Sequence, residues 1–117
     1  MSSQAAAIDA VFHALAVPAR RAMVERLSLG PASVTELAKP LAISLPAVVQ
    51  HLEVLVTSGL VRTKKTGRVR VCHIEPAALR TTEDWIAKLR SNWARCLDRL
   101  AKELGESQIR REPGDKA

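Results

Sequence analysis

The 117-residue sequence contains few cysteines and few aromatic residues, and it has no long apolar run. Two cysteines, Cys72 and Cys96, are too few for a disulfide framework, which excludes the small disulfide-stapled secreted domains. No apolar stretch approaches membrane-spanning length, and no basic segment leads into an apolar run at the start. We therefore expect a protein of the reducing cytoplasm, with enough residues for one compact domain.

Motifs that mark enzymes and metal sites are also missing. There is no glycine-rich phosphate loop, no Ser-His-Asp or Cys-His arrangement and no pair of carboxylates suited to a cleft. The histidines, His13, His51 and His73, fall on three separate predicted elements, and no soft-ligand cluster has metal-site spacing. We expect no enzyme, cofactor or metal ion. The charge balance instead favours an anionic partner, nucleic acid before membrane, because 18 basic and 12 acidic residues give a net charge of +6.

Residues 44–55 predict a helix that fits the major groove of DNA. Ser44 is a suitable N-cap, Pro46 fits the first turn and Gly59 suits the C-terminal cap. Apolar residues recur at helical spacing on one face: Val48, Leu52 and Leu55. The opposite face near the helix start is small and carries one bidentate-capable amide, Gln50, which suits close approach to base edges. Taken alone, the segment is equally consistent with an ordinary core helix.

Two further helices are predicted near the N-terminus. Apolar residues at helical spacing define the first: Ile8, Val11, Phe12 and Leu15. Phe12, the single phenylalanine, is expected to anchor the core. Pro18 begins a second helix that runs to about Leu29. Arg20 and Arg21 in its first turn have the wrong sign for the helix dipole, which hints at a phosphate contact, with plain exposed arginines as the alternative.

A short third helix completes a recognisable pattern. Ser33 and Glu36 have the spacing of a capping box, and Pro40 limits the length of the helix that they begin. A tight turn then leads to the helix that starts at Ser44. Two helices joined in this way, the second opening with small residues, form a helix-turn-helix pattern.

The segment after the proposed recognition helix alternates with period two and predicts a β-hairpin. Its strands cover residues 60–65 and 68–74, with the turn at Thr66–Gly67. The hairpin has no acidic residue and is rich in basic ones: Arg62, Lys64, Lys65, Arg68 and Arg70. A basic hairpin in this place is typical of a wing whose tip reaches the minor groove or flanking phosphates. The alternative is an edge hairpin whose lysines block aggregation.

A long last helix is predicted from about Thr82 to Leu104, opened by a capping box at residues 81–84. Its apolar residues form one stripe: Trp85, Ile86, Leu89, Trp93, Cys96, Leu97, Leu100 and Leu104. Such a helix spans about 34 Å, more than a small core needs, so we interpret it as a dimerisation helix with the first helix beside it. The predicted interface comprises Ile8, Phe12, Trp85, Leu89, Trp93, Leu97 and Leu100. An intramolecular core stripe is the alternative. Residues 1–6 and 105–117 are expected to be disordered.

Several segments resemble the ArsR family of winged helix-turn-helix repressors. The similar segments are residues 14–21 (family ALADPTRR), 35–38 (ELA), 43–55 (LSQPTVSKHLKVL), 58–62 (AGLV) and 67–68 (GR). The resemblance covers about residues 8–75, and the long last helix fits it. It implies a homodimeric bacterial repressor that binds a near-palindromic operator, often in its own promoter.

Three departures from the family pattern change local chemistry. Val17 replaces the usual aspartate, which removes a helix cap worth ~1 kcal/mol. Leu45 and Val49 replace polar residues near the groove, so the operator sequences of relatives cannot be transferred. Metal-sensing members carry cysteines on the third helix or Asp and His ligands on the last. Residues 34–38 contain no cysteine and the predicted last helix contains no histidine, so the resemblance implies no metal site.

Together these patterns predict a mainly α-helical winged helix-turn-helix with a small β-hairpin, of order α-α-α-α-β-β-α, over residues 7–104. It would act as a dimeric regulator that binds double-stranded DNA. The predicted recognition-helix contacts are Ser44, Leu45, Pro46, Ala47, Gln50 and His51. The predicted wing and backbone contacts are Arg20, Arg62, Lys64, Lys65, Arg68 and Arg70. The alternative is a winged-helix module that binds protein. No motif indicates the inducing signal, so an organic effector, a thiol signal or autorepression alone all fit.

Overall fold

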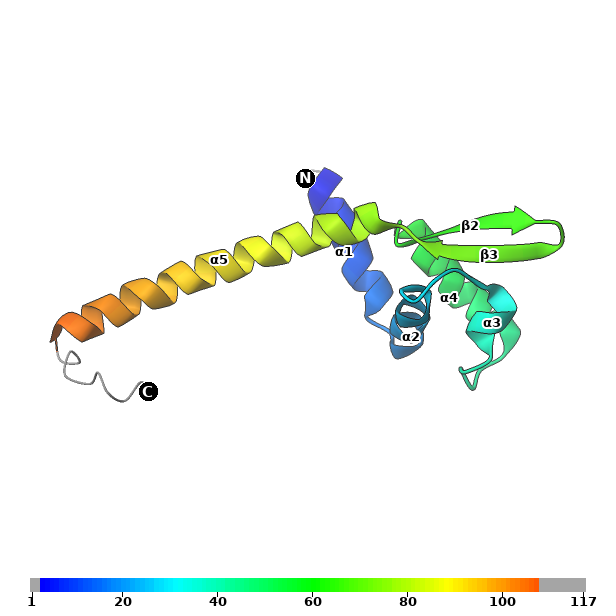
Figure 1. The fold of residues 1–117 in the computed structure, drawn as a ribbon, viewed down its shortest axis with the longest axis horizontal. Coiled ribbons are helices and arrows are strands. Elements are labelled where there is room, and N and C mark those ends of the chain that lie inside the picture. Colours follow the sequence, from blue (N-terminus) through cyan, green and yellow to red (C-terminus); the bar gives the residue numbers. More distant parts are fainter. Residues whose placement is uncertain (1–2, 108–117) are drawn as a thin grey trace. The chain divides into compact units, whose positions relative to one another are not determined.

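The computed structural model describes residues 3–107, and its elements follow the predicted order with one added strand (Figure 1). The elements are α1 (Ser3–Leu15), α2 (Pro18–Leu27), β1 (Ala32–Ser33), α3 (Val34–Ala38), α4 (Leu45–Thr57), β2 (Val61–Thr66), β3 (Val69–Ile74) and α5 (Pro76–Ser107). The chain divides into two compact units, one up to Thr82 and one from Glu83, so α5 contributes to both. The predicted fold class is confirmed.

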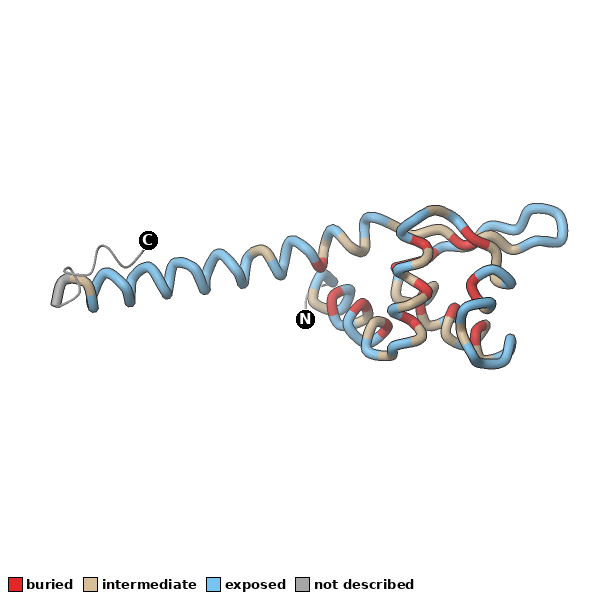
Figure 2. Tube along the Cα trace, turned by 60° about the horizontal axis from the view of Figure 1, so that its bottom comes forward, coloured by how far each residue is buried: buried red, intermediate tan, exposed pale blue. Residues whose placement is uncertain are grey.

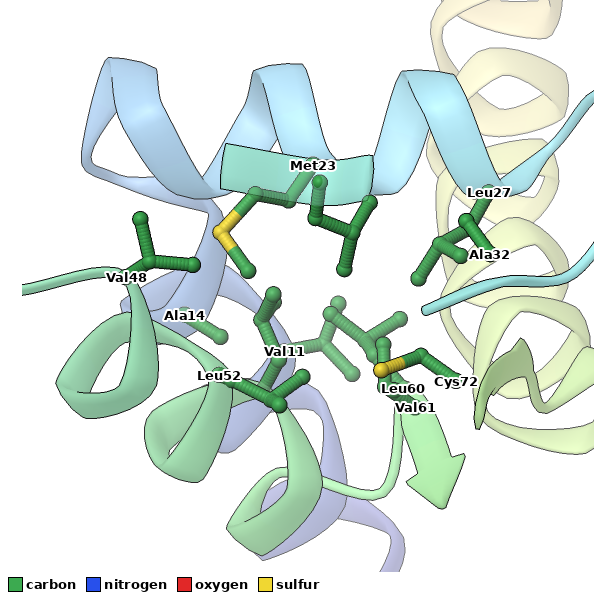
Figure 3. Close-up of a cluster of buried hydrophobic side chains, with 12 residues drawn as sticks. Val11, Ala14, Met23, Leu27, Ala32, Val48, Leu52, Leu60, Val61 and Cys72 are labelled. Atoms are coloured by element: carbon green, nitrogen blue, oxygen red, sulfur yellow. The ribbon is translucent and has the colours of Figure 1, made fainter. Parts of the chain in front are cut away.

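One hydrophobic core holds the first unit together (Figure 3). Its buried side chains come from the first four helices, from all three strands and from the approach to β2: Val11, Ala14, Met23, Leu27, Ala32, Leu37, Val48, Leu52, Leu55, Leu60, Val61 and Cys72. The predicted apolar face of α4 is therefore confirmed. Phe12 is 43% exposed, so its assignment as a core anchor is wrong. Val11 takes the inward position on α1. Because successive helix residues are about 100° apart, the next residue, Phe12, points away from the core.

Strand β3 is central in a three-stranded antiparallel sheet of order β1-β3-β2. Pairing of β2 with β3 reaches Thr66 and Val69, which leaves Gly67 and Arg68 as the two-residue turn. Gly67 has φ +64° and Arg68 has no positive φ, the pattern of a type II′ turn that favours glycine first. The predicted turn was one residue too early. Strand β1 was not predicted, because two residues leave no alternating pattern.

The predicted N-caps of α3 and α4 are both present. Ser33 Oγ accepts a hydrogen bond from the Glu36 amide at 3.1 Å, and Glu36 Oε1 accepts one from the Ser33 amide at 2.8 Å. Ser44 Oγ accepts from the Ala47 amide at 3.3 Å at the start of α4. Gly59 follows α4 with φ +86°, in the left-handed region that helix C-terminal caps use. Ser44 and Gly59 therefore define the two ends of α4.

The capping box at Ser33 and Glu36 contributes to stability at neutral pH, and this contribution is lost in acid. The hydrogen bond from the Ser33 amide lowers the pKa of the Glu36 carboxyl below its usual value. A lowered folded-state pKa stabilises the fold above the unfolded-state pKa, and this contribution is lost as the pH falls. We expect Glu36→Gln to lower the melting temperature at neutral pH and to reduce its decline toward pH 3–4. Thermal unfolding across pH tests this, with Glu25→Gln as the exposed control; equal slopes for all three proteins would contradict it.

Helix α5 begins at Pro76 rather than near Thr82. Proline fits the first helical turn, where an amide hydrogen has no partner. The Thr81 and Thr82 hydroxyls donate to the carbonyls of Ala77 and Ala78 at 3.3 Å, four residues back. Both threonines are therefore interior helix residues, and the predicted capping box at this place is wrong.

The ends of the first and last helices also differ from prediction. Residues 3–6, expected to be disordered, form the first turn of α1, since glutamine and alanine are good helix formers. Helix α5 continues through Gly105 to Ser107. The remainder of the predicted tail, residues 108–117, lies outside the described residues. Among the described helices, none combines the length and apolarity needed to cross a membrane.

Candidate DNA-binding interface

The outer face of α4 at its N-terminal end is small and uncharged. Its predicted contact residues are exposed or half-buried: Leu45, Pro46 and Gln50 are exposed, and Ala47 and His51 are half-buried. The Ser44 hydroxyl already serves as the helix cap, so its hydrogen-bonding capacity is partly used. Gln50 is left as the one exposed amide able to read a base edge through two hydrogen bonds. Leu45 is 51% exposed and offers an apolar contact of the kind that a thymine methyl accepts.

The hairpin β2–β3 has an exposed tip that carries most of its basic residues (Figure 2). Lys64, Lys65 and Arg68 are exposed and form no ion pair within residues 3–107. Arg62 is different, because its Nε donates to Glu75 Oε1 at 3.1 Å near the base of the hairpin. The free cations therefore lie toward the turn, where a wing would meet phosphates.

A salt bridge joins the wing to the recognition helix. Arg70 on β3 donates to Glu53 Oε2 on α4 at 3.0 Å. Both side chains are partly exposed, so the bridge is worth only about 0–1 kcal/mol. Its geometric effect is to restrain the angle between α4 and the hairpin. The sequence did not predict this role for Arg70, since neither partner lies near the other along the chain.

A hollow of about 310 Å³ lies between the wing and the start of α4. Its walls come from the start of α3, the first residue of α4 and the wing: Ser33, Val34, Thr35, Leu45, Arg68, Val69 and Arg70. Two arginines and two hydroxyl-bearing residues therefore line the same concave surface as Leu45. The recognition helix and the wing thus form one continuous surface suited to a polyanionic backbone.

Arg20 does not belong to this surface. The residue is 8% exposed, with Nε donating to the Ala14 carbonyl at 2.7 Å and Nη2 to the His13 carbonyl at 3.2 Å. Arg21 similarly donates to the Leu15 carbonyl at 2.8 Å. The predicted phosphate contact by Arg20 is therefore wrong. Both arginines satisfy the last carbonyls of α1, where the helix dipole favours positive charge.

The apolar stripe of α5 beyond Thr82 is exposed. Trp85, Leu89, Trp93, Leu97 and Leu100 are 38%, 47%, 64%, 45% and 49% exposed. Within residues 83–107, these side chains form no core of their own. Ile8, also assigned to the dimer interface, is only 8% exposed in the single chain, so its side chain offers little surface to a partner.

The two cysteines lie in different surroundings. Cys72 is buried in the first unit, and burial raises the pKa of its thiol despite the opposing charge of Arg70. A protonated buried thiol is a poor nucleophile. Cys96 is exposed on α5, like the other side chains of the apolar stripe. Within residues 3–107, no three His, Cys, Asp or Glu side chains form a group able to hold a metal ion.

The fold and the sequence both match known regulators. A family model described as a helix-turn-helix domain matches residues 15–64. The HTH-type transcriptional regulator Rv2034 of Mycobacterium tuberculosis is 46% identical over 95 residues, which are 77% of this chain and 88% of that protein. The crystal structure of the ArsR family transcriptional regulator RHA00566 is 44% identical, with a TM-score of 0.73 over 80% of this chain and 97% of that one. An ArsR-like transcriptional regulator from Rhodococcus sp. RHA1 is 28% identical, with a TM-score of 0.74 over 86% and 95% of the two chains.

The family model covers α2 to α4 and the start of β2, and the relatives align over 77% to 86% of the chain. Helix-turn-helix regulators bind double-stranded DNA, and they are not enzymes. The chain therefore belongs to the ArsR family of winged helix-turn-helix transcriptional regulators.

Proposed function

We propose that the protein is a homodimeric repressor that binds a near-palindromic operator, including one in its own promoter. The observation that carries this proposal is the continuous surface formed by the small face of α4, the adjoining hollow and the free cations of the wing. Its place of action would be the cytoplasm, because its ligand is chromosomal DNA.

The proposed contacts divide into base reading and backbone binding. Gln50 reads a base edge in the major groove, and Leu45 with Ala47 lies against neighbouring base methyl groups. Lys64 and Arg68 at the wing contact phosphates or the adjacent minor groove, with Lys65 beside them. A dimer would place two such helices on half-sites about 34 Å apart, which is why the operator is proposed to be near-palindromic. A repressor of this kind would act by covering promoter DNA.

The proposed dimer forms through α5. Leu89, Trp93, Leu97 and Leu100 lie at helical spacing and are 45% to 64% exposed. Exposed apolar stripes of this kind mark contacts between proteins, and closed dimers are the commonest solution. Phe12 on α1, 43% exposed, remains a proposed contact residue of the same interface.

Two arginines of the wing provide a matched test of the backbone contacts. We expect Arg68→Ala to weaken operator binding and to reduce the slope of log K against log salt by about 0.9 per protomer, the value of one phosphate contact. Arg62→Ala should change this slope less, because Arg62 already pairs with Glu75. Fluorescence anisotropy with a fragment from upstream of the gene, across a salt series, measures both. If Arg68→Ala and the parent have the same slope, the wing does not contact DNA.

We propose further that operator binding does not depend on metal ions. The absence of a ligand group within residues 3–107 and of cysteines in α3 supports this. Operator affinity should then be the same in Zn²⁺ and in chelator, to within about twofold. A tenfold difference would indicate a metal-sensing role instead.

A further inference from the structure

Arg20 connects three helices of the first unit. It lies on α2, donates to two carbonyls at the end of α1, and places its Nη1 nitrogen 3.4 Å from His51 Nδ1 on α4. The guanidinium group thus contacts two helices besides its own, α1 and α4. The recognition helix is one of them.

The direction of the bond to His51 follows from the chemistry of arginine. A guanidinium group has only donors, so His51 Nδ1 must be the bare nitrogen that accepts. The proton of the neutral ring then lies on Nε2. His51 is half-buried. Leu52 and Leu55, which follow it on α4, are fully buried in the core and hold this part of the helix in place.

We propose that Arg20 and His51 position the recognition helix for DNA, with His51 acting as a positioning residue rather than a DNA contact. The inference rests on the proposed function of α4. Arg20 is fixed by the end of α1, because its bond to the Ala14 carbonyl is short and its side chain is buried. Its third contact fixes the rotation of α4 about its own axis near the turn that carries Gln50.

Two substitutions of His51 separate this role from a phosphate contact. His51→Asn puts an acceptor oxygen near the position of Nδ1, whereas His51→Gln puts its amide near the position of Nε2. We expect the Asn variant to keep operator affinity within about twofold of the parent. The Gln variant should bind roughly two- to tenfold more weakly, the range expected for one intramolecular hydrogen bond. Helix propensity alone favours the opposite order, since glutamine is the better helix former.

A double-mutant cycle tests the link without DNA. Arg20→Lys, His51→Gln and the double variant are compared by chemical unfolding, with Arg21→Gln and its combination with His51→Gln as the control cycle. Arg21 is exposed and bonds only to the end of α1. The losses of stability at Arg20 and His51 should be non-additive, while those at Arg21 and His51 should add. If Arg20→Lys fails to fold, the operator affinities of His51→Asn and His51→Gln still show whether His51 positions α4 or contacts DNA.

Different results would contradict the Arg20–His51 link and the proposed function. Additive losses at Arg20 and His51 would overturn the link, and normal binding by His51→Gln with weak binding by His51→Asn would assign His51 to DNA instead. A parent protein that does not distinguish operator from scrambled DNA would overturn the proposed function. In that case the unfolding cycle would still test the connection between Arg20 and His51.

Discussion

Replacing Leu89 and Leu97 together with glutamate is expected to give a folded monomer with operator affinity reduced at least a hundredfold. Both side chains are nearly half exposed in the single chain, so the glutamates are solvated there and the fold of each protomer is retained. In a dimer the same positions would bury charge against an apolar face, which is costly without a partner. Loss of the second recognition helix removes an avidity of about 10²–10⁴.

Analytical ultracentrifugation and anisotropy on the same samples measure the two effects. Leu29→Glu is the control, because Leu29 is 84% exposed and lies in the link between α2 and β1, outside the apolar stripe of α5. It should leave both mass and affinity unchanged. A double variant that stays dimeric, or a monomer with parental affinity, would contradict the proposed role of the stripe.

Replacing Leu52 with alanine is expected to lower the free energy of unfolding by about 2–5 kcal/mol. Leu52 is fully buried on the inner face of α4, where its side chain is part of the core. Alanine leaves a cavity that the neighbouring helices fill only in part. The loss is a large part of the stability of a small domain, so a fraction of the variant would be unfolded near 37 °C.

Leu45→Ala on the same helix is the matched control. Leu45 is 51% exposed, so this substitution should change the free energy of unfolding by less than about 0.5 kcal/mol while still weakening operator binding. Urea unfolding at one fixed protein concentration measures stability, because a dimer links it to concentration. Equal destabilisation by both substitutions would show that the inner and outer faces of α4 are assigned wrongly.

Local patterns were sufficient to predict the helix-turn-helix and the wing. The caps at Ser33 and Ser44 and the alternation of residues 60–74 depend on neighbours within a few positions. The role of Arg20 could not be read in this way. Its partners lie six, seven and 31 residues away and become neighbours only when three helices pack. The one local signal was the short link between α1 and α2, which brings the start of one helix to the end of the other.

The start of α5 shows a different limit of sequence reasoning. The pair Thr81–Thr82 followed by two acids has the composition of a helix start, yet Pro76 already provides one. A helix that has begun continues through threonines whose hydroxyls bond back to carbonyls four residues earlier. Exposure of Phe12 likewise depends on which face of α1 meets the core, and apolar character alone does not fix that face.

Dimeric, sequence-specific binding is tested most directly by a footprint of the purified protein on DNA from upstream of its gene, with stoichiometry measured on the protected fragment. We expect two chains per site and two protected half-sites related by a dyad, 34–36 Å or a multiple of that distance apart. Protection should disappear as salt rises, with a steep slope. Uniform weak protection of upstream and scrambled DNA, or a single chain per site, would contradict a dimeric, sequence-specific repressor.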